Sequence, residues 1–172
     1  SQWEPELKKR EKDALERAKQ ELAEEINFWK MLQYLFYRQW SRLKKYANDK
    51  GIRIIGDVPI YVAMDSADVW ANPEQFYLDE ELSPFDVAGC PPDAFSEDGQ
   101  LWGNPLFRWD VMKKDGYRWW MKRLEKVSKL FDVIRIDHFR GFDSYYAIPF
   151  GDDTARNGEW REGPGIELFR TI

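Results

Sequence analysis

The stretch FDVIRIDH, residues 131–138, decides the fold class of this chain. Residues 133–136 are mostly β-branched and follow a helical segment, so they predict a buried strand. A second stretch of the same kind, IRIIGDVP at residues 52–59, also follows a helical segment and is closed by glycine and proline. Two successive helix-then-strand units are typical of a parallel α/β architecture. We therefore expect an α/β fold.

The helices that precede these strands are visible in the spacing of apolar residues. Residues 5–50 read as helix, with a highly charged first part and apolar residues three and four apart from Phe28 to Ala47. Gly51 predicts a left-handed cap at the end of this segment. A further helix is expected between residues 115 and 130, with an apolar face running from Tyr117 to Val127.

Residues 60–114 form an unusual connection between the two predicted units. They contain five prolines, three glycines and many Asp, Asn and Ser residues, and a structureless crossover of this length is uncommon in a compact domain. We expect a large excursion that carries short helices and folds over the strand ends. Aromatic side chains recur along it, and rings exposed on loops are suited to stacking on sugars or nucleobases.

Composition narrows the choice of ligand and compartment. The 172 residues carry a net charge of −5 with no basic stripe, which disfavours a nucleic-acid partner and favours sugar. The lone Cys90 excludes an intrachain disulfide and is typical of a reducing cytoplasm. No apolar run approaches the roughly 20 residues of a membrane-spanning helix, and the N-terminus lacks the features of a secretory signal. We expect a soluble, cytoplasmic protein with no membrane partner.

Charged residues lie near the ends of both predicted strands, at Asp57 and at Arg135 with Asp137. Ligands bind at the C-terminal ends of strands in α/β sheets and barrels. Residues two apart share one face of a strand, so Arg135 and Asp137 point the same way and the cation keeps the carboxylate ionised. The pair is interpreted either as a buried structural ion pair that sets strand register, or as a carboxylate kept ionised and dry for nucleophilic attack on a glycosidic bond.

His138, the single histidine, is next to Asp137 and points to the opposite face unless the strand has already ended. Two interpretations of His138 are equally good: a structural histidine with satisfied hydrogen bonds, or a residue of the functional site. No spacing of His, Cys, Asp and Glu is typical of a metal site, and no glycine-rich phosphate loop follows either strand. We expect no metal and no cofactor.

Three motifs together resemble the amylomaltase family, also called 4-α-glucanotransferases or disproportionating enzymes, which is related to the α-amylases. They are IGDVPIYVA with DSADVW at residues 55–63 and 65–70, AGCPPDAFS with GQLWGNP at 88–96 and 99–105, and RIDHFRGF at 135–142. The segments around residues 33–40 and 163–165 also fit, so the resemblance covers essentially the whole chain.

The resemblance implies a (β/α)₈ TIM barrel with insertions, of which this chain is a partial fragment with a large loop and helix insertion. The expected segments are helices at 1–51, a barrel strand at 52–59, an active-site loop excursion at 60–114, a helix plus the nucleophile strand at 115–142, and the following loop and helix start at 143–172.

The resemblance also implies transfer of a 4-α-glucan segment between α-1,4-glucans such as maltodextrin or starch, with retention of configuration. Asp137 would be the nucleophile and Arg135 would hold it ionised. Residues 88–100 would be a lid that keeps water from the covalent intermediate. The substrate contacts implied by the resemblance are Asp57 and His138 on sugar hydroxyls, Trp102 against a sugar ring, and Gln100, Asn104 and Pro92.

The chain departs from the family pattern in three ways. Ala94 stands where a tyrosine is common, Cys90 stands where valine is usual, and the motifs of the acid/base glutamate and of a further aspartate are not found before Ile172. We therefore expect the 172-residue fragment to be inactive alone, and to self-associate or bind the missing remainder of the barrel. The parent is expected in the cytoplasm, or in a plastid if it comes from a plant.

Other functions remain open on sequence alone. A glucan hydrolase of the amylase clan would use the same nucleophile, and a non-catalytic glucan-binding or scaffold fragment would rely on loop aromatics such as Trp70 and Trp102. A designed or chimeric half-barrel would carry the same motifs.

Overall fold

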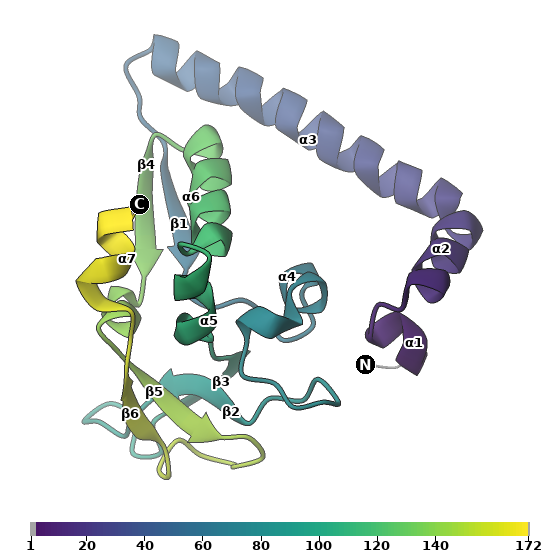
Figure 1. Cartoon of the computed structure of the whole chain (residues 1–172). Coiled ribbons are helices and arrows are strands. Elements are labelled where there is room, and N and C mark those ends of the chain that lie inside the picture. The colour runs from purple at the N-terminus through teal and green to yellow at the C-terminus, as the bar shows by residue number, and fades with distance from the viewer. Residues whose placement is uncertain (1–2, 172) are drawn as a thin grey trace. The chain divides into compact units, whose positions relative to one another are not determined.

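The computed structural model describes residues 3–171 of the chain. The chain divides into two compact units. The first comprises residues up to Gly56 together with Ser128–Val133, and the second comprises Asp57–Val127 and residues from Ile134 onward. The elements confirm the predicted α/β class, because strands and helical elements are interspersed along the chain from Ile55 onward (Figure 1).

The first unit is helical, as the charged and apolar periodicity of residues 5–50 predicts. Pro5 starts the first helix at a position where its missing N–H is not needed. Gly51 has a φ of 76° immediately after the longest helix, which is the left-handed cap expected there. The three helices are α1 (Pro5–Lys8), α2 (Lys12–Glu21) and α3 (Ala23–Asp49).

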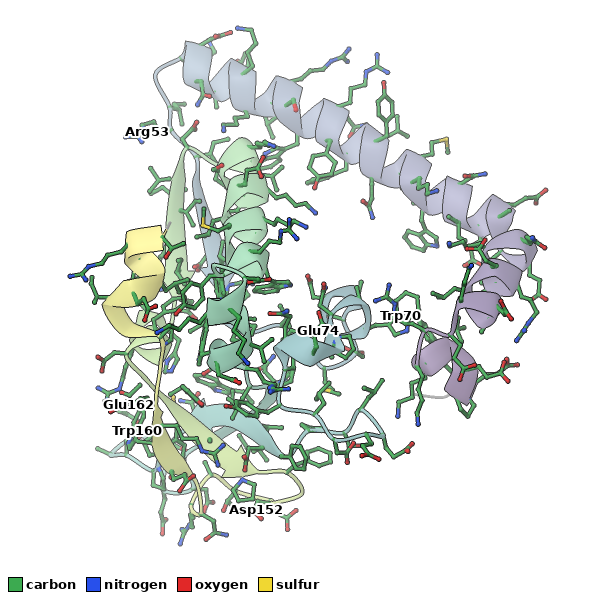
Figure 2. The ribbon with its side chains drawn as sticks, in the orientation of Figure 1. Arg53, Trp70, Glu74, Asp152, Trp160 and Glu162 are labelled. Carbon is green, nitrogen blue, oxygen red and sulfur yellow. The ribbon has the colours of Figure 1, made fainter. Side chains whose placement is uncertain are left out.

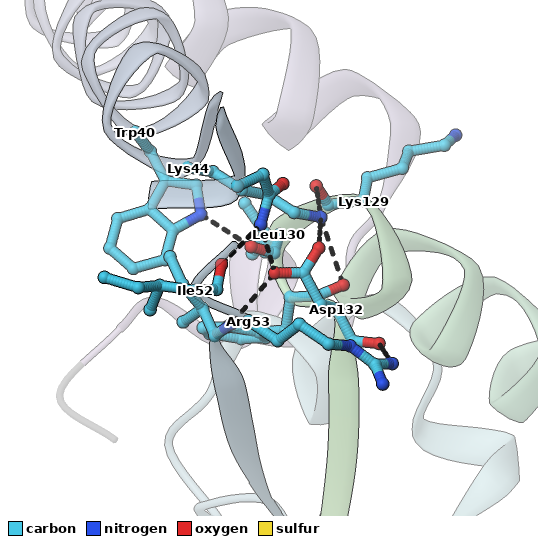
Figure 3. Close-up of polar contacts among 10 residues, drawn as sticks. Trp40, Lys44, Ile52, Arg53, Lys129, Leu130 and Asp132 are labelled. Atoms are coloured by element: carbon cyan, nitrogen blue, oxygen red, sulfur yellow. Dashed lines mark hydrogen bonds and ion pairs between the residues drawn. The ribbon is translucent and has the colours of Figure 1, made fainter. Parts of the chain in front are cut away.

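The C-terminal part of α3 is tied to residues 128–133 by a polar network (Figure 3). The indole Nε1 of Trp40 donates to the carbonyl of Leu130 at 2.8 Å, and the ammonium of Lys44 donates to the carbonyl of Phe131 at 3.1 Å. The carboxylate of Asp132 accepts from the backbone N–H of Ile54 at 2.8 Å, and these hydrogen bonds hold its pKa below the usual range. The network fixes the chain just before both strands of the small sheet begin.

Strands β1 (Ile55–Pro59) and β4 (Val133–Asp137) form a two-stranded sheet. Their arrows run side by side in the same direction in Figure 1, which confirms the parallel pairing of the two helix-then-strand units. The prediction that both strands are buried is wrong for one face. Gly56 and Val58 are buried, whereas the face that carries Asp57, Arg135 and Asp137 is exposed, because nothing among residues 3–171 covers it.

The core of the second unit is dominated by aromatic rings. Phe76, Phe107 and Trp120 are at most 1% exposed, and Phe107 lies 5.7 Å from Trp120 between ring centroids. Several aromatic residues of the 60–114 excursion are therefore core residues rather than exposed stacking platforms, because its short elements bring them together. The helical elements of this unit are α4 (Ala67–Ala71), η1 (Pro73–Gln75), α5 (Trp109–Lys114), α6 (Arg118–Leu130, whose last turn belongs to the first unit), η2 (Phe139–Phe142) and α7 (Gly165–Thr171).

A second, antiparallel sheet was not expected from the sequence. Its strand order is β3-β2-β5-β6. Two of its strands lie in the stretch predicted as a loop excursion with short helices, and two lie in the stretch predicted as a following loop. Each strand is only four to six residues long and includes or adjoins Gly or Pro, so the periodicity was too short to read. The strands are β2 (Asp86–Cys90), β3 (Gln100–Pro105), β5 (Ser144–Pro149) and β6 (Glu159–Glu162).

Candidate active site

Three charged side chains meet on the exposed face of the parallel strand pair. The guanidinium of Arg135 donates through Nη1 to Oδ2 of Asp57 at 2.7 Å, and through Nη2 to Oδ1 of Asp137 at 3.3 Å. Arg135 and Asp137 share a face because they are two residues apart on β4, and the pairing of β1 with β4 brings Asp57 opposite them. One planar cation thus holds two carboxylates in place.

The three side chains are more exposed to solvent than the sequence predicted. The side chains of Asp57, Arg135 and Asp137 are 56%, 63% and 63% exposed, so the expectation of a dry, buried carboxylate is wrong for residues 3–171. The reason is the uncovered face of the sheet on which all three stand. Exposed ion pairs contribute only about 0–1 kcal/mol each, so the trio orients its carboxylates more than it stabilises the fold.

A pocket of about 170 Å³ opens at the C-terminal ends of β1 and β4. It combines one carboxylate, one imidazole, one amide and an indole with apolar and aromatic wall residues, a mixture typical of sites that bind polar ligands with flat apolar faces. The lining residues are Pro59, Ile60, Tyr61, Trp102, Asn104, Asp137 and His138.

His138 lies in this pocket because β4 ends at Asp137. It adopts a left-handed backbone conformation with a φ of 50°, which is uncommon for a residue with a side chain and turns the imidazole toward the same pocket as Asp137. Its ring lies 4.8 Å from that of Trp102, edge to face. Its Nε2 is shielded from solvent and has no hydrogen-bond partner within residues 3–171. Burial lowers the pKa of His138, against the opposing effect of Asp137 and together with that of Arg140.

Strand β3 provides the opposite wall of the pocket. The indole Nε1 of Trp102 donates to Oε1 of Gln100 at 2.9 Å, so Gln100 orients the wall without lining the pocket. Asn104 lines the pocket and donates through Nδ2 to the carbonyl of Val62 at 2.9 Å. Trp102 remains 37% exposed, which leaves part of its ring available to a ligand.

Two of the candidate residues predicted from the sequence, Pro92 and Trp70, stand apart from the pocket. Pro92 is exposed and lies in the β2–β3 loop, residues 91–99, which contributes nothing to the pocket lining. Trp70 lies on α4 and Trp160 on β6 (Figure 2), and neither lines the pocket. Of the loop aromatics considered for glucan binding, Trp102 alone among the described residues both lines the pocket and is substantially exposed.

Sequence reasoning missed the segment that follows Asp57. Pro59, Ile60 and Tyr61 form one side of the pocket, and Tyr61 is 6% exposed, so burial raises its pKa well above the usual range. Arg123 donates to the carbonyls of Pro59 at 2.7 Å and of Ile60 at 2.9 Å and fixes this segment. The signal was available, since residues that directly follow a strand end are candidates for the same site.

Comparison with known proteins gives consistent results. The family model described as 4-alpha-glucanotransferase matches residues 1–172. A 4-alpha-glucanotransferase from Thermus thermophilus is 56% identical over 172 residues, and one from Clostridium butyricum is 52% identical over 171. These matches cover 100% and 99% of this chain but 34% and 35% of the relatives. The chain therefore spans about a third of the length of the curated relatives it matches.

A solved structure agrees with the sequence comparison. The amylomaltase from Streptococcus agalactiae in complex with acarbose matches with a TM-score of 0.96 and 48% identity, covering 99% of this chain and 34% of that one. The arrangement of both sheets is thus that of one part of a larger enzyme fold.

Proposed function

The chain belongs to the 4-alpha-glucanotransferase family, and we propose that it carries the nucleophile half of an enzyme that transfers 4-α-glucan segments between α-1,4-glucans. The observation that supports this most directly is the position of Asp137. It is held by Arg135 and lines the same pocket as Trp102 and His138. A cytoplasmic location, or a plastid one in a plant, remains a prediction; no helix among the described residues has the length and apolarity needed to cross a membrane.

The proposed reaction proceeds in two displacements. A carboxylate oxygen of Asp137 attacks the anomeric carbon of the donor glucan, the bond from that carbon to the leaving O4 breaks, and the leaving oxygen takes a proton from a general acid. The 4-hydroxyl of an acceptor glucan then attacks the glycosyl-aspartate, gives up its proton to the same group, and releases Asp137. Two inversions at one carbon give net retention.

The general acid is proposed to come from the part of the protein outside residues 3–171. Retaining chemistry needs a second carboxyl about 5–5.5 Å from the nucleophile. Asp57 is the carboxylate that shares Arg135 with Asp137, and its hydrogen bond at 2.7 Å to that cation supports a role in binding sugar hydroxyls.

The remaining pocket residues are proposed to bind and orient the sugar. The exposed part of the Trp102 indole is suited to the apolar face of a glucose ring. His138 lines the pocket, and its unpartnered Nε2 is proposed to form a hydrogen bond with a sugar hydroxyl after a small movement of the ring uncovers this atom. The site is exposed in the described part of the chain. We propose that another part of the intact protein covers it, because excluding water from the covalent intermediate favours transfer over hydrolysis.

The test uses the intact protein and maltotriose as both donor and acceptor. Transfer yields longer maltodextrins together with glucose, whereas hydrolysis yields glucose and maltose alone. Asp137→Asn is expected to lower kcat by about 10³-fold or more, because the amide cannot form the glycosyl ester. Asp110→Asn, at an exposed carboxylate on α5, serves as the matched control.

Two results would contradict the proposal. Hydrolysis without longer products would indicate a glucan hydrolase. Saturable maltodextrin binding that survives Asp137→Asn and is lost in Trp102→Ala, in an intact protein without turnover, would indicate a glucan-binding protein.

A further inference from the structure

The β2–β3 loop is a compact turn that holds itself together. The carboxylate Oδ1 of Asp93 accepts from the backbone N–H groups of Phe95 and Ser96, each at 2.8 Å. The hydroxyl of Ser96 donates to the carbonyl of Gly99 at 2.7 Å. The loop is exposed along most of its length, with Phe95 fully exposed at its tip, so its own hydrogen bonds set its shape but not its position.

The position of the loop is set by the connection between β5 and β6. Nε of Arg156 donates to Oδ1 of Asp98 at 2.7 Å, and Nη2 donates to Oε1 of Glu97 at 3.2 Å. The backbone N–H of Ala155 donates to the carbonyl of Asp98 at 2.9 Å. One guanidinium and one amide from a single hairpin therefore hold two consecutive residues of the loop.

The β5–β6 hairpin that holds the loop is itself anchored in the core. Ala155 is 0% exposed, and its carbonyl accepts from the hydroxyl of Tyr146 at 3.0 Å. Gly99 lies so close to Ala155 that a Cβ at Gly99 would come within 2.7 Å of the alanine methyl. The loop is thus fastened to a rigid support at the point where it leads into β3.

The pocket wall begins immediately after this anchor. Gly99 is followed directly by Gln100, which orients Trp102. Asn104, two residues after Trp102, also lines the pocket. Asp137, in contrast, stands on β4, and the side chain that holds it is Arg135 of the same strand.

We propose that Arg156 is a positioning residue: it clamps the β2–β3 loop to the β5–β6 hairpin and thereby fixes the Trp102–Asn104 wall of the glucan pocket. This inference rests on the proposed function. Because the clamp acts on the binding wall and not on the nucleophile, its loss weakens glucan binding and raises KM more than it lowers kcat. The side chain of Arg156 is 52% exposed, so the fold does not depend on it.

The experiment compares Arg156→Ala, Arg156→Lys and the control Arg108→Ala in the intact protein. Arg108 is matched because it also forms an exposed ion pair, with Asp110 at 3.5 Å, outside the loop. Arg156→Ala is expected to raise KM for maltotetraose about two- to fivefold with kcat changed less than about twofold, since exposed charge pairs are worth factors of this size. Arg156→Lys is expected to recover part of the loss, and Arg108→Ala to resemble the wild type.

Hydrogen exchange provides a readout that needs no turnover. The amides of residues 93–99 and of Ala155 are expected to exchange faster in Arg156→Ala than in the wild type. About 0.5 M salt is expected to weaken maltotetraose binding by the wild type more than by Arg156→Ala, because the clamp is ionic and screened. If the alanine variant does not fold, Arg156→Gln, which keeps a polar side chain but removes the charge, takes its place in the kinetic, exchange and salt comparisons.

The outcomes separate the two proposals. An intact wild type that binds maltotetraose without transferring glucan contradicts the proposed function, while binding and exchange still test the clamp. The clamp is refuted if Arg156→Ala matches the wild type in KM and affinity, if Arg108→Ala has the same effect, or if only kcat falls. It is also refuted if salt affects the wild type and the alanine variant equally.

Discussion

At the residue scale, the decisive arrangement is one arginine between two carboxylates on neighbouring strands. Arg135 donates from different nitrogens to Asp57 and Asp137, which a planar fork of five N–H groups can do and a point charge cannot. The same side chain therefore orients Asp137 and ties it to Asp57 on the neighbouring strand.

This geometry predicts that lysine cannot replace Arg135. In the intact protein, Arg135→Lys is expected to lower kcat/KM by about tenfold or more, because one ammonium cannot keep both carboxylates in register. Steady-state transfer kinetics with maltotriose measure the effect, with Arg108→Lys as the control. Activity within about twofold of the wild type would show that charge alone suffices.

His138 predicts a pH dependence of stability. Its pKa in the folded chain is lowered by burial, so the unfolded chain binds a proton more readily, beginning near its ordinary pKa of about 6.5. The contribution of His138 to stability is fully present above about pH 6.5 and is lost as pH falls through the lower folded value. Two charged neighbours also act on the pKa of His138: Asp137 raises it and Arg140 lowers it.

Thermal unfolding of the wild type and of His138→Gln between pH 5 and 8 measures this effect. The wild type is expected to lose Tm more steeply than the variant as pH falls below about 6.5. Parallel curves over this range would mean that the imidazole titrates equally in the folded and unfolded chains.

At the scale of elements, the start of β1 depends on close packing against residues that precede β4. A Cβ added at Gly56 would overlap the ring of Phe131, and that ring packs edge to face on Trp40 of α3 at 5.7 Å. Glycine is therefore required at Gly56 for space, whereas Gly51 is required for its φ of 76° with open space around it.

Two alanine variants separate these requirements. Gly56→Ala is expected to cost about 1–3 kcal/mol, because the ring must move within a packed junction. Gly51→Ala is expected to cost about 1 kcal/mol through backbone strain alone. Chemical denaturation of the intact protein measures both, and a smaller loss for Gly56→Ala than for Gly51→Ala would contradict the packing argument.

At the scale of the whole molecule, the described chain leaves much apolar surface uncovered. Long α3 has no buried residue, and the face of the β1–β4 sheet that carries the charged trio is open. Exposed apolar surface of this extent indicates an interface with another protein segment or another protein chain. The large exposed side chains of α3 include Phe28, Trp29, Tyr34, Phe36, Tyr37 and Tyr46.

The 172-residue polypeptide is therefore expected to self-associate. Both strands of the two-stranded sheet have an unpaired edge in the sheet as described, which adds a route to association through backbone hydrogen bonds. Sedimentation velocity at micromolar concentration is expected to give species larger than the 20.6 kDa monomer. A single sharp monomer peak would contradict the prediction.

The sequence by itself determined the parallel strand pair and the presence of Arg135 and Asp137 on one face of it. Both follow from local rules: β-branched runs after helices form strands, and side chains alternate with a period of two. The motif resemblance then identified the family, which the comparisons confirm.

The tertiary structure alone decided which distant residues meet. Trp102 faces His138 because β3 belongs to an antiparallel sheet whose short strands leave no clear periodicity in the sequence, and because His138 adopts a left-handed backbone conformation. It also decided that the core, not the surface, takes up Phe76 and Phe107, and that the charged trio stands in the open. Such outcomes depend on the packing of segments far apart in the chain, which no local pattern encodes.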